Sequence, residues 1–262
     1  MKNLFMEYRL KISFDREINH HHFSLKCLPK SQPRQVINDM RVYIDADYFS
    51  FSRDCFGNRF WYGYKEKPHT ELNVHVKAKA QVDWTVYDKD NRLNAIFLLP
   101  TKQTNVGENL LPFWQKCRDD CMKLHSTYAK ALYIMQMVHD TMKYVPGTTT
   151  IQTTADEAFS LRRGVCQDYA QIMVAIARKM NIPARYVAGV MLGEQLTHAW
   201  VEIFADGYWY GLDPTNNMLV SDIYIIFSRG RDYQDCLVNK GIFFSPEPAV
   251  QKQNILLTVK EI

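Results

Sequence analysis

Apolar and polar residues alternate with a period of two over much of the first third of the chain. The alternation covers residues 8–14, 40–44 and 72–86, and Gly57-Asn58 between them has the composition of a turn. A period of two is typical of strands that bury one face. Short strands separated by turns predict a small antiparallel β-sandwich.

Beyond a mixed, polar stretch at 87–107, apolar residues recur every three to four positions, which predicts amphipathic helices. Thr154 and Glu157 have the spacing of a capping box, so we expect a helix to begin just after Thr154. The helical stripe that precedes this box comprises Tyr128, Leu132, Met135, Val138 and Met142.

After a further helix that begins near Gly164, the pattern returns to strands. These are expected at 184–192, 197–204 and 208–213, and 254–262 is typical of a last strand. Helices followed by antiparallel strands predict an α+β unit. The 262 residues suffice for two small domains. We therefore expect an N-terminal β-sandwich domain at 1–100 and an α+β domain at 101–262.

Cys166 lies in the first turn of the helix that follows Gly164, because apolar residues recur at helical spacing from Val165 to Met180. The free N–H groups and the positive dipole end of a helix N-terminus favour a thiolate, the nucleophilic form of cysteine. Buried structural cysteines are common, and for an isolated Gly-x-Cys that interpretation is the more frequent one. The residues downstream decide between the two.

Asp206-Gly207 predicts a two-residue hairpin turn between the strands at 197–204 and 208–213. Pairing Ala205 with Tyr208 places Trp200 opposite Asp213, so His198 and Asp213 become diagonal neighbours on one face. There the carboxylate would fix the imidazole tautomer and leave the other ring nitrogen for a thiol. Either residue alone is more often structural, since His198 fits a strand and Asp213 precedes a proline. Together with Cys166 they predict a Cys-His-Asp catalytic triad.

The segments GVCQDYA (164–170), THAWVEIF (197–204) and WYGLDPTNN (209–217) resemble the bacterial transglutaminase-like cysteine peptidase family. YRLKISFD (8–15) and HTELNVHVKAKAQV (69–82) resemble the β-rich N-terminal domain commonly fused to it. The resemblance implies an α+β, papain-like transglutaminase core behind the β-sandwich. It also implies Cys166 as nucleophile, His198 as base and then acid, and Asp213 as the orienting group.

Cysteine-dependent acyl chemistry on a peptide or protein amide follows from this resemblance, and the acceptor stays open. Hydrolysis by a peptidase or amidase is the first hypothesis, and transglutamination is the second. A non-catalytic peptide-binding module is the third, although it would not need all three residue types. The backbone N–H of Cys166 is expected in the oxyanion hole, and Tyr144 is a weaker candidate for a second donor. The N-terminal sheet is expected to shape substrate access.

Composition and charge indicate which partners, location and cofactors to expect. The formal net charge is +4, with basic and acidic residues interspersed, so we expect no nucleic-acid or membrane partner. Without an apolar stretch near the roughly 20 residues of a membrane span or an evident signal peptide, a cytoplasmic location is expected. The six cysteines are then expected to be reduced. No cofactor or metal is expected, and His20, His21 and His22 are interpreted as a solvated strand end. The sequence does not indicate the oligomeric state.

Overall fold

The N-terminal part of the protein forms antiparallel strands, as the alternation predicts. The computed structural model describes residues 1–86 and 95–262. The strands are β1 (Lys2–Leu25), β2 (Gln35–Ile44), β3 (Tyr48–Arg53), β4 (Arg59–Lys65) and β5 (His69–Val82). The predicted turn at Gly57 joins β3 to β4, and its φ of +73° is one that glycine adopts without strain.

Strand β1 is long enough to belong to two sheets. Its first half pairs with β5, and β5 pairs in turn with β2. Its second half pairs with β4, and β4 pairs with β3. The register of the β1–β5 ladder shifts between Ser13 and Ile18, where the strand passes from one sheet to the other. The two sheets enclose a core that includes Leu4, Met6, Tyr8 and Leu10 of β1.

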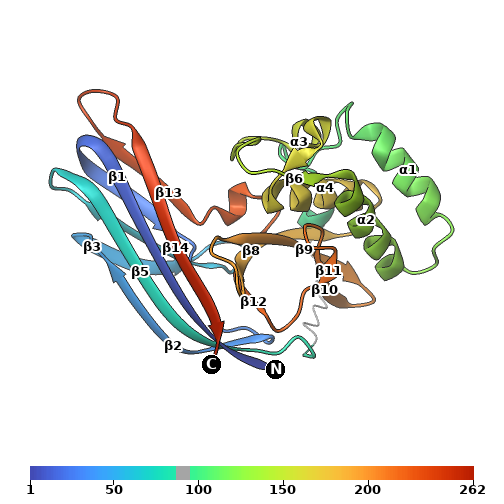
Figure 1. Ribbon diagram of the computed structural model, residues 1–262, viewed down its shortest axis with the longest axis horizontal. Coiled ribbons are helices and arrows are strands. Elements are labelled where there is room, and N and C mark those ends of the chain that lie inside the picture. The colour runs from blue at the N-terminus through green and yellow to red at the C-terminus, as the bar shows by residue number, and fades with distance from the viewer. Residues whose placement is uncertain (87–94) are drawn as a thin grey trace.

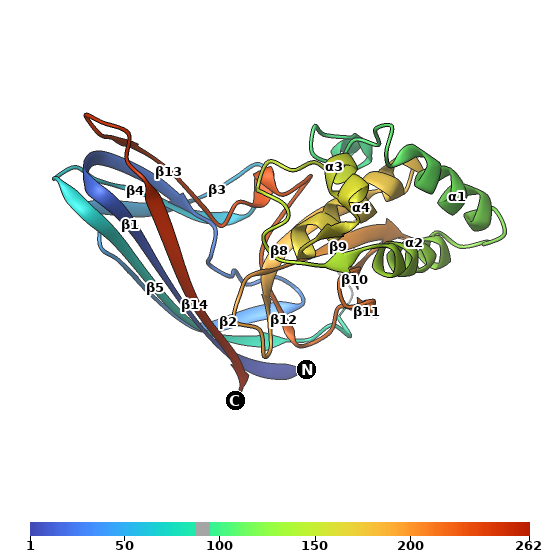
Figure 2. The same ribbon diagram turned by 45° about the horizontal axis from the view of Figure 1, so that its top comes forward.

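The C-terminal strands join this N-terminal sheet, which differs from the predicted division at residue 100. Both β13 (Asn239–Phe244) and β14 (Gln251–Glu261) pair antiparallel with β1. Figures 1 and 2 show the two chain ends side by side at one end of the sheet. Alternation identifies a strand and its buried face, but it carries no information about the partner strand. The predicted boundary stretch falls partly on 87–94, outside the described residues.

The α+β unit has helices first and strands afterwards, as predicted. The helical elements are η1 (Ala95–Leu98), α1 (Leu111–Cys121), α2 (Thr127–Thr141), α3 (Ala155–Leu161), α4 (Cys166–Lys179) and η2 (Gln234–Cys236). The strands are β6 (Lys143–Tyr144), β7 (Arg163–Gly164), β8 (Ala184–Met191), β9 (His198–Ala205), β10 (Tyr208–Asp213), β11 (Met218–Leu219) and β12 (Tyr224–Gly230). The main antiparallel sheet has the order β11-β10-β9-β8-β12. The predicted capping box of Thr154 and Glu157 opens α3.

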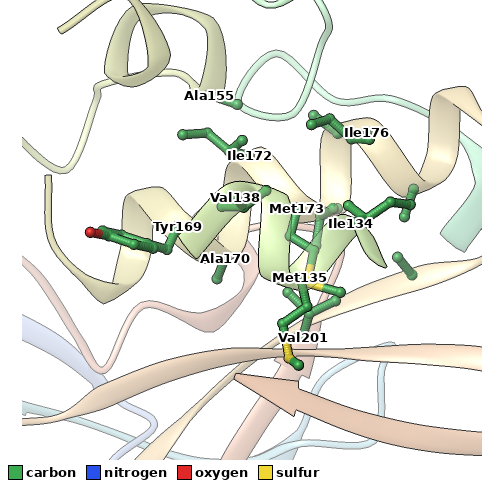
Figure 3. Close-up of a cluster of buried hydrophobic side chains, with 14 of the residues drawn as sticks. Ile134, Met135, Val138, Ala155, Tyr169, Ala170, Ile172, Met173, Ile176 and Val201 are labelled. Atoms are coloured by element: carbon green, nitrogen blue, oxygen red, sulfur yellow. The ribbon is translucent and has the colours of Figure 1, made fainter. Parts of the chain in front are cut away.

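Helix α4 is the centre of this unit. It packs against α2 and α3 on one side and against β8 and β9 on the other. Figure 3 shows Ile172, Met173 and Ile176 of α4 among side chains of α2 and β9. Because α4 is enclosed on several sides, its first residue is held in a fixed position relative to the sheet.

The opposite side of the main sheet faces the N-terminal domain. Val190 of β8, with Ile225 and Phe227 of β12, is buried in the same hydrophobic cluster as β1 and β5. The N-terminal sheet and the α+β unit therefore share a continuous apolar contact, which fixes the position of β14 relative to the β8–β9 loop (Figure 2).

One prediction for the N-terminal sheet is wrong. His20 and His22 are exposed, as expected for a solvated strand end, but His21, close to the C-terminal end of β1, is buried. Strand alternation explains the difference, because His21 shares its face with the buried Phe23. Among the described residues, no helix has the length and apolar character needed to span a membrane.

Candidate active site

Cys166 is the first residue of α4, in agreement with the sequence prediction. The turn before it is held by the buried carboxylate of Asp168, whose Oδ2 accepts hydrogen bonds from Val165 N and Thr149 Oγ1, each at 2.7 Å. A Cβ at Gly164 would lie 2.4 Å from that same oxygen. Glycine at 164 thus allows the carboxylate to close over the helix start and to fix the backbone that presents Cys166.

The Cys166 thiol lies beside His198, the first residue of β9. The two side chains line the same pocket and interact electrostatically, and Sγ is 4.0 Å from the carbonyl oxygen of Thr197. Nε2 of His198 is 2.7 Å from Oδ2 of Asp213, which leaves Nδ1 as the ring nitrogen for the thiol. The structure therefore brings together all three side chains of the predicted triad.

The hairpin register that places His198 and Asp213 on one face is confirmed. Tyr208 pairs with Ala205, and the ladder continues to Leu212 opposite Val201. Asp213 then pairs with Met218 of β11, so its strand continues into a second, shorter hairpin. The turn between β9 and β10 uses positive φ angles at Asp206 and Gly207, as a two-residue turn with both central residues left-handed requires.

Asp213 is fully buried and held by several donors besides His198. Oδ1 accepts from the backbone N–H groups of Thr215 and Asn216, at 2.9 and 3.2 Å. Oδ2 accepts from Asn216 Nδ2 and the Tyr224 hydroxyl, each at 2.8 Å. A carboxylate with this many donors is fixed in position and stays ionised.

The pKa values of His198 and Asp213 are shifted in opposite directions from their usual values. Burial favours the neutral imidazole, but the hydrogen bonds and charges of Asp213 and Cys166 outweigh it and raise the pKa of His198 to about 10. For Asp213, burial favours the neutral acid, but His198, Asn216 and Tyr224 together lower the carboxyl pKa below its usual value. The site therefore favours an imidazolium beside a carboxylate, the charge state that accompanies a thiolate nucleophile.

A pocket of about 250 Å³ opens over the thiol. Its lining residues are Tyr144, Cys166, Glu194, Leu196, Thr197, His198, Thr215 and Asn216. Tyr144 lies in β6, whose pairing with β7 places it opposite Gly164 and so next to Cys166. Burial, with the charges of Cys166 and Glu194, raises the pKa of Tyr144, so its hydroxyl stays protonated and able to donate.

Sequence reasoning missed several residues around the triad. Asn216 has a recognisable signal, because an aspartate followed three residues later by asparagine in a turn often accepts local N–H bonds. Tyr224 and Glu194 have no such signal, since folding alone brings β12 and the β8–β9 loop to the site. Within residues 1–86 and 95–262, no group of three or more His, Cys, Asp or Glu side chains is arranged as metal ligands.

Helices followed by an antiparallel sheet, with a β-rich domain in front, define a papain-like transglutaminase core. Comparison with known families agrees with this class. Residues 118–214 match the transglutaminase-like superfamily core, and residues 5–81 match the bacterial transglutaminase-like N-terminal region. Residues 118–214 therefore form a transglutaminase-like core, and residues 5–81 form the N-terminal region that accompanies it in bacterial proteins of this kind.

Other proteins resemble this chain in sequence or in fold. A protein of Mycobacterium leprae is 29% identical over 252 residues, which cover 83% of this chain and 85% of the relative. A protein-glutamine gamma-glutamyltransferase of Pseudomonas aeruginosa is 32% identical over 100 residues, or 32% of this chain and 15% of that protein. A crystal structure from Cytophaga hutchinsonii, provisionally assigned as a cysteine protease, has a TM-score of 0.79 at 19% identity. That match covers 100% of this chain and 92% of the other, and it shows the shared fold.

Proposed function

We propose that the protein is a cysteine hydrolase that cleaves a peptide bond or a related amide. The observation that carries the proposal is one pocket in which Cys166 lies beside His198, while His198 hydrogen-bonds to the buried Asp213. The position of Cys166 at the start of α4 supports it further, because a helix N-terminus stabilises a thiolate.

In the first half-reaction, the Cys166 thiolate attacks the carbonyl carbon and forms a C–S bond. The tetrahedral oxyanion accepts a hydrogen bond from the backbone N–H of Cys166, and we assign the Tyr144 hydroxyl as a second donor. His198 gives its proton to the amine nitrogen as the C–N bond breaks, which leaves a thioester. Asp213 keeps Nδ1 of His198 directed at the reacting atoms throughout.

In the second half-reaction, His198 takes a proton from water, and the resulting hydroxide attacks the thioester carbon. The C–S bond then breaks, the carboxylic acid leaves, and the proton on His198 restores the ion pair. Transglutamination is the second candidate, since an amine in place of water would give a new amide by the same steps. The similarity to the Pseudomonas aeruginosa acyltransferase favours keeping that alternative.

The test is incubation of the purified protein with a peptide mixture and a labelled primary amine, followed by mass spectrometry. Cleaved peptides are expected, whereas amine adducts on glutamine would identify transfer. Cys166→Ala should remove either product. Cys55→Ala is the matched control, because Cys55 is exposed and lies outside the pocket. Absence of both products with folded protein would overturn the proposal, as would equal activity in Cys166→Ala.

A further inference from the structure

A second and larger cavity adjoins the catalytic pocket. It has a volume of about 810 Å³ and lies between the β8–β9 loop and the N-terminal sheet. Glu194 and Leu196 line both this cavity and the pocket over Cys166. The remaining lining residues are Glu7 and Arg9 of β1, Gly193 and Gln195 of the loop, and 255–258 of β14. A chain bound in the larger cavity would therefore lead directly to the thiol.

The wall contributed by β14 is the edge of a sheet. One side of β14 pairs with β1 along almost its whole length, from Gln251 to Glu261. On its other side, no strand of the described chain is paired with it. Figure 1 shows this edge facing the α+β unit. An open edge next to a proposed active site is a natural place for an added strand, because edge strands present unpaired backbone groups.

The direction of the β14 backbone groups follows from two hydrogen bonds. Ile262 N donates to Asn3 O, so even-numbered residues of this strand direct their N–H and C=O groups at β1. Gly193 N donates to Val259 O at 3.4 Å, so odd-numbered residues direct theirs away from β1. Ile255 and Leu257 therefore present N–H and C=O groups toward the open edge that borders the larger cavity.

A negative charge lies where the two cavities meet. Glu194 is exposed, and the described ion pairs do not include it. Its charge nevertheless reaches the site, since it helps to raise the pKa values of Tyr144 and Tyr224. Glu7, the other carboxylate of the larger cavity, is already paired with Arg9 at 2.8 Å and with Lys77 at 3.5 Å. A bound cationic side chain would thus be attracted to Glu194.

We propose that the substrate is an extended peptide segment that adds as a strand to the open edge of β14 and places a basic side chain against Glu194. The backbone of the peptide pairs with Ile255 and Leu257, which are about 7 Å apart at the usual rise of a strand. An extended segment also leaves its amide carbonyl free for attack at Cys166. The inference rests on the proposed function, because it assigns the substrate of that same thiol.

Two sets of synthetic peptides, based on a sequence cleaved by the full-length protein, test the inference. In the first set, the side chain nearest the cleaved bond is Lys, norleucine or Glu. We expect kcat/KM to favour Lys over Glu by about tenfold or more for the parent protein. The preference should vanish in Glu194→Gln and reverse in Glu194→Lys. The matched control is Glu108→Lys, which makes the same charge change at an exposed residue outside both cavities and should keep the preference.

In the second set, single backbone nitrogens of the peptide are methylated in turn, which removes one N–H donor at a time. Two positions separated by one residue should each lose at least about tenfold in kcat/KM, while the position between them tolerates methylation. Uniform tolerance along the peptide would overturn strand addition. An unchanged Lys preference in Glu194→Lys would overturn the role of Glu194.

A small ester, p-nitrophenyl acetate, separates failure of this inference from failure of the proposed function. Its acyl group reaches Cys166 without occupying the larger cavity. Turnover of ester and peptide that depends on Cys166 but not on peptide charge or methylation would support the proposed hydrolase. The same result would refute strand addition at the open edge of β14. Absence of any Cys166-dependent turnover would refute the hydrolase itself.

Discussion

Both parts of the protein contain buried histidines, and the surroundings of His198 in one part and of His21 in the other differ in one respect. His198 of β9 faces a carboxylate, with Nε2 2.7 Å from Asp213 Oδ2. His21 of β1 faces a second histidine, with Nδ1 3.3 Å from Nε2 of His69 and the two rings stacked at 12°. Phenylalanine rings, including that of Phe14, complete the surroundings of His21.

Burial disfavours the charged imidazolium at both positions, so burial alone does not distinguish them. At His21, burial lowers the pKa to about 4, and electrostatic interactions with the neighbouring His69 and Lys65 act in the same direction. At His198, Asp213 and Cys166 overcome burial and raise the pKa to about 10. The partner therefore decides the charge: His21 is a neutral part of a hydrophobic core, and His198 can hold a proton for a reaction.

The largest expected difference between these two histidines is in catalysis. His198→Ala should lower kcat/KM by about 10³-fold or more, because it removes the general base and acid. His21→Ala should leave kcat/KM within a few-fold and lower the unfolding free energy by about 2 kcal/mol or more, because it opens a cavity in a core. Steady-state kinetics and thermal melts on both variants check this, and a full rate in His198→Ala would contradict it.

Asp213→Asn tests the partner rather than the histidine. The amide keeps the shape of the side chain and loses its charge, so His198 loses both its preferred tautomer and the charge that raises its pKa. We expect kcat/KM to fall by about 10²- to 10⁴-fold and the pH–rate profile to shift. Asp206→Asn, at the tip of the β9–β10 turn, is the control and should match the parent. An unshifted profile in Asp213→Asn would mean that the carboxylate does not set the charge of His198.

The sequence predicts the local parts of the site well. Asp206-Gly207 determines the hairpin register, and the apolar stripe after Gly164 places Cys166 at a helix start. Both depend on residues close together in the chain, where turn chemistry and periodicity act. The His198 and Asp213 pairing follows from that register alone.

Contacts between distant segments are not predictable in this way. The alternation at 254–262 predicts a strand, but its pairing with β1 depends on how the two parts of the chain pack. Tyr224 reaches Asp213 only because β12 folds next to β8. His21 lies in a run of three histidines, a composition that predicts a solvent-exposed segment. Its side chain nevertheless faces the core, because the register of β1 places it on the buried face.

Alkylation of the cysteines tests whether His198, unlike His21, activates a neighbouring thiol. Cys166 should react with iodoacetamide faster than the other five cysteines, since a helix N-terminus and an adjacent imidazolium favour the thiolate. Cys55 is the informative rival, because it is exposed, whereas Cys27, Cys117, Cys121 and Cys236 are buried. Limited labelling near pH 6 with peptide mapping should show at least about tenfold selectivity for Cys166 over Cys55. His198→Ala should reduce this selectivity and His21→Ala should not, and equal labelling of Cys55 would contradict an activated thiol.

The pH dependence of stability should carry opposite contributions from the two histidines. Between the unfolded pKa of roughly 6.5 and the folded value of about 4, the unfolded chain protonates His21 while the folded protein does not. Stability therefore falls as pH falls through this window, by up to about 3 kcal/mol. His198 has a raised folded pKa, so its contribution is fully present below pH 6.5 and is lost as pH rises through about 10.

Urea unfolding of the parent and of His21→Phe at pH 4 to 7 isolates the first contribution. The carboxylates contribute equally to the pH dependence of the unfolding free energy of both proteins. As the pH falls, the stability of His21→Phe relative to the parent should therefore increase. The same pair compared at pH 7 to 10 should show no further change. Parallel curves across the acidic window would show that His21 is not held neutral.

The smallest expected effect is at the hydroxyl of Tyr224, which donates to Asp213 at 2.8 Å. Asp213 keeps His198, Thr215 and Asn216 as donors in Tyr224→Phe, so kcat/KM should fall by less than tenfold and stability by about 1 kcal/mol. Tyr8→Phe is the matched control, because the buried Tyr8 hydroxyl has no hydrogen-bond partner among the described residues and its loss should cost nothing. In an Asp213→Asn background, Tyr224→Phe should have a smaller effect than in the parent, since the charge that strengthens the bond is gone. Equal effects in both backgrounds would mean that Tyr224 acts through packing rather than through the carboxylate that distinguishes His198 from His21.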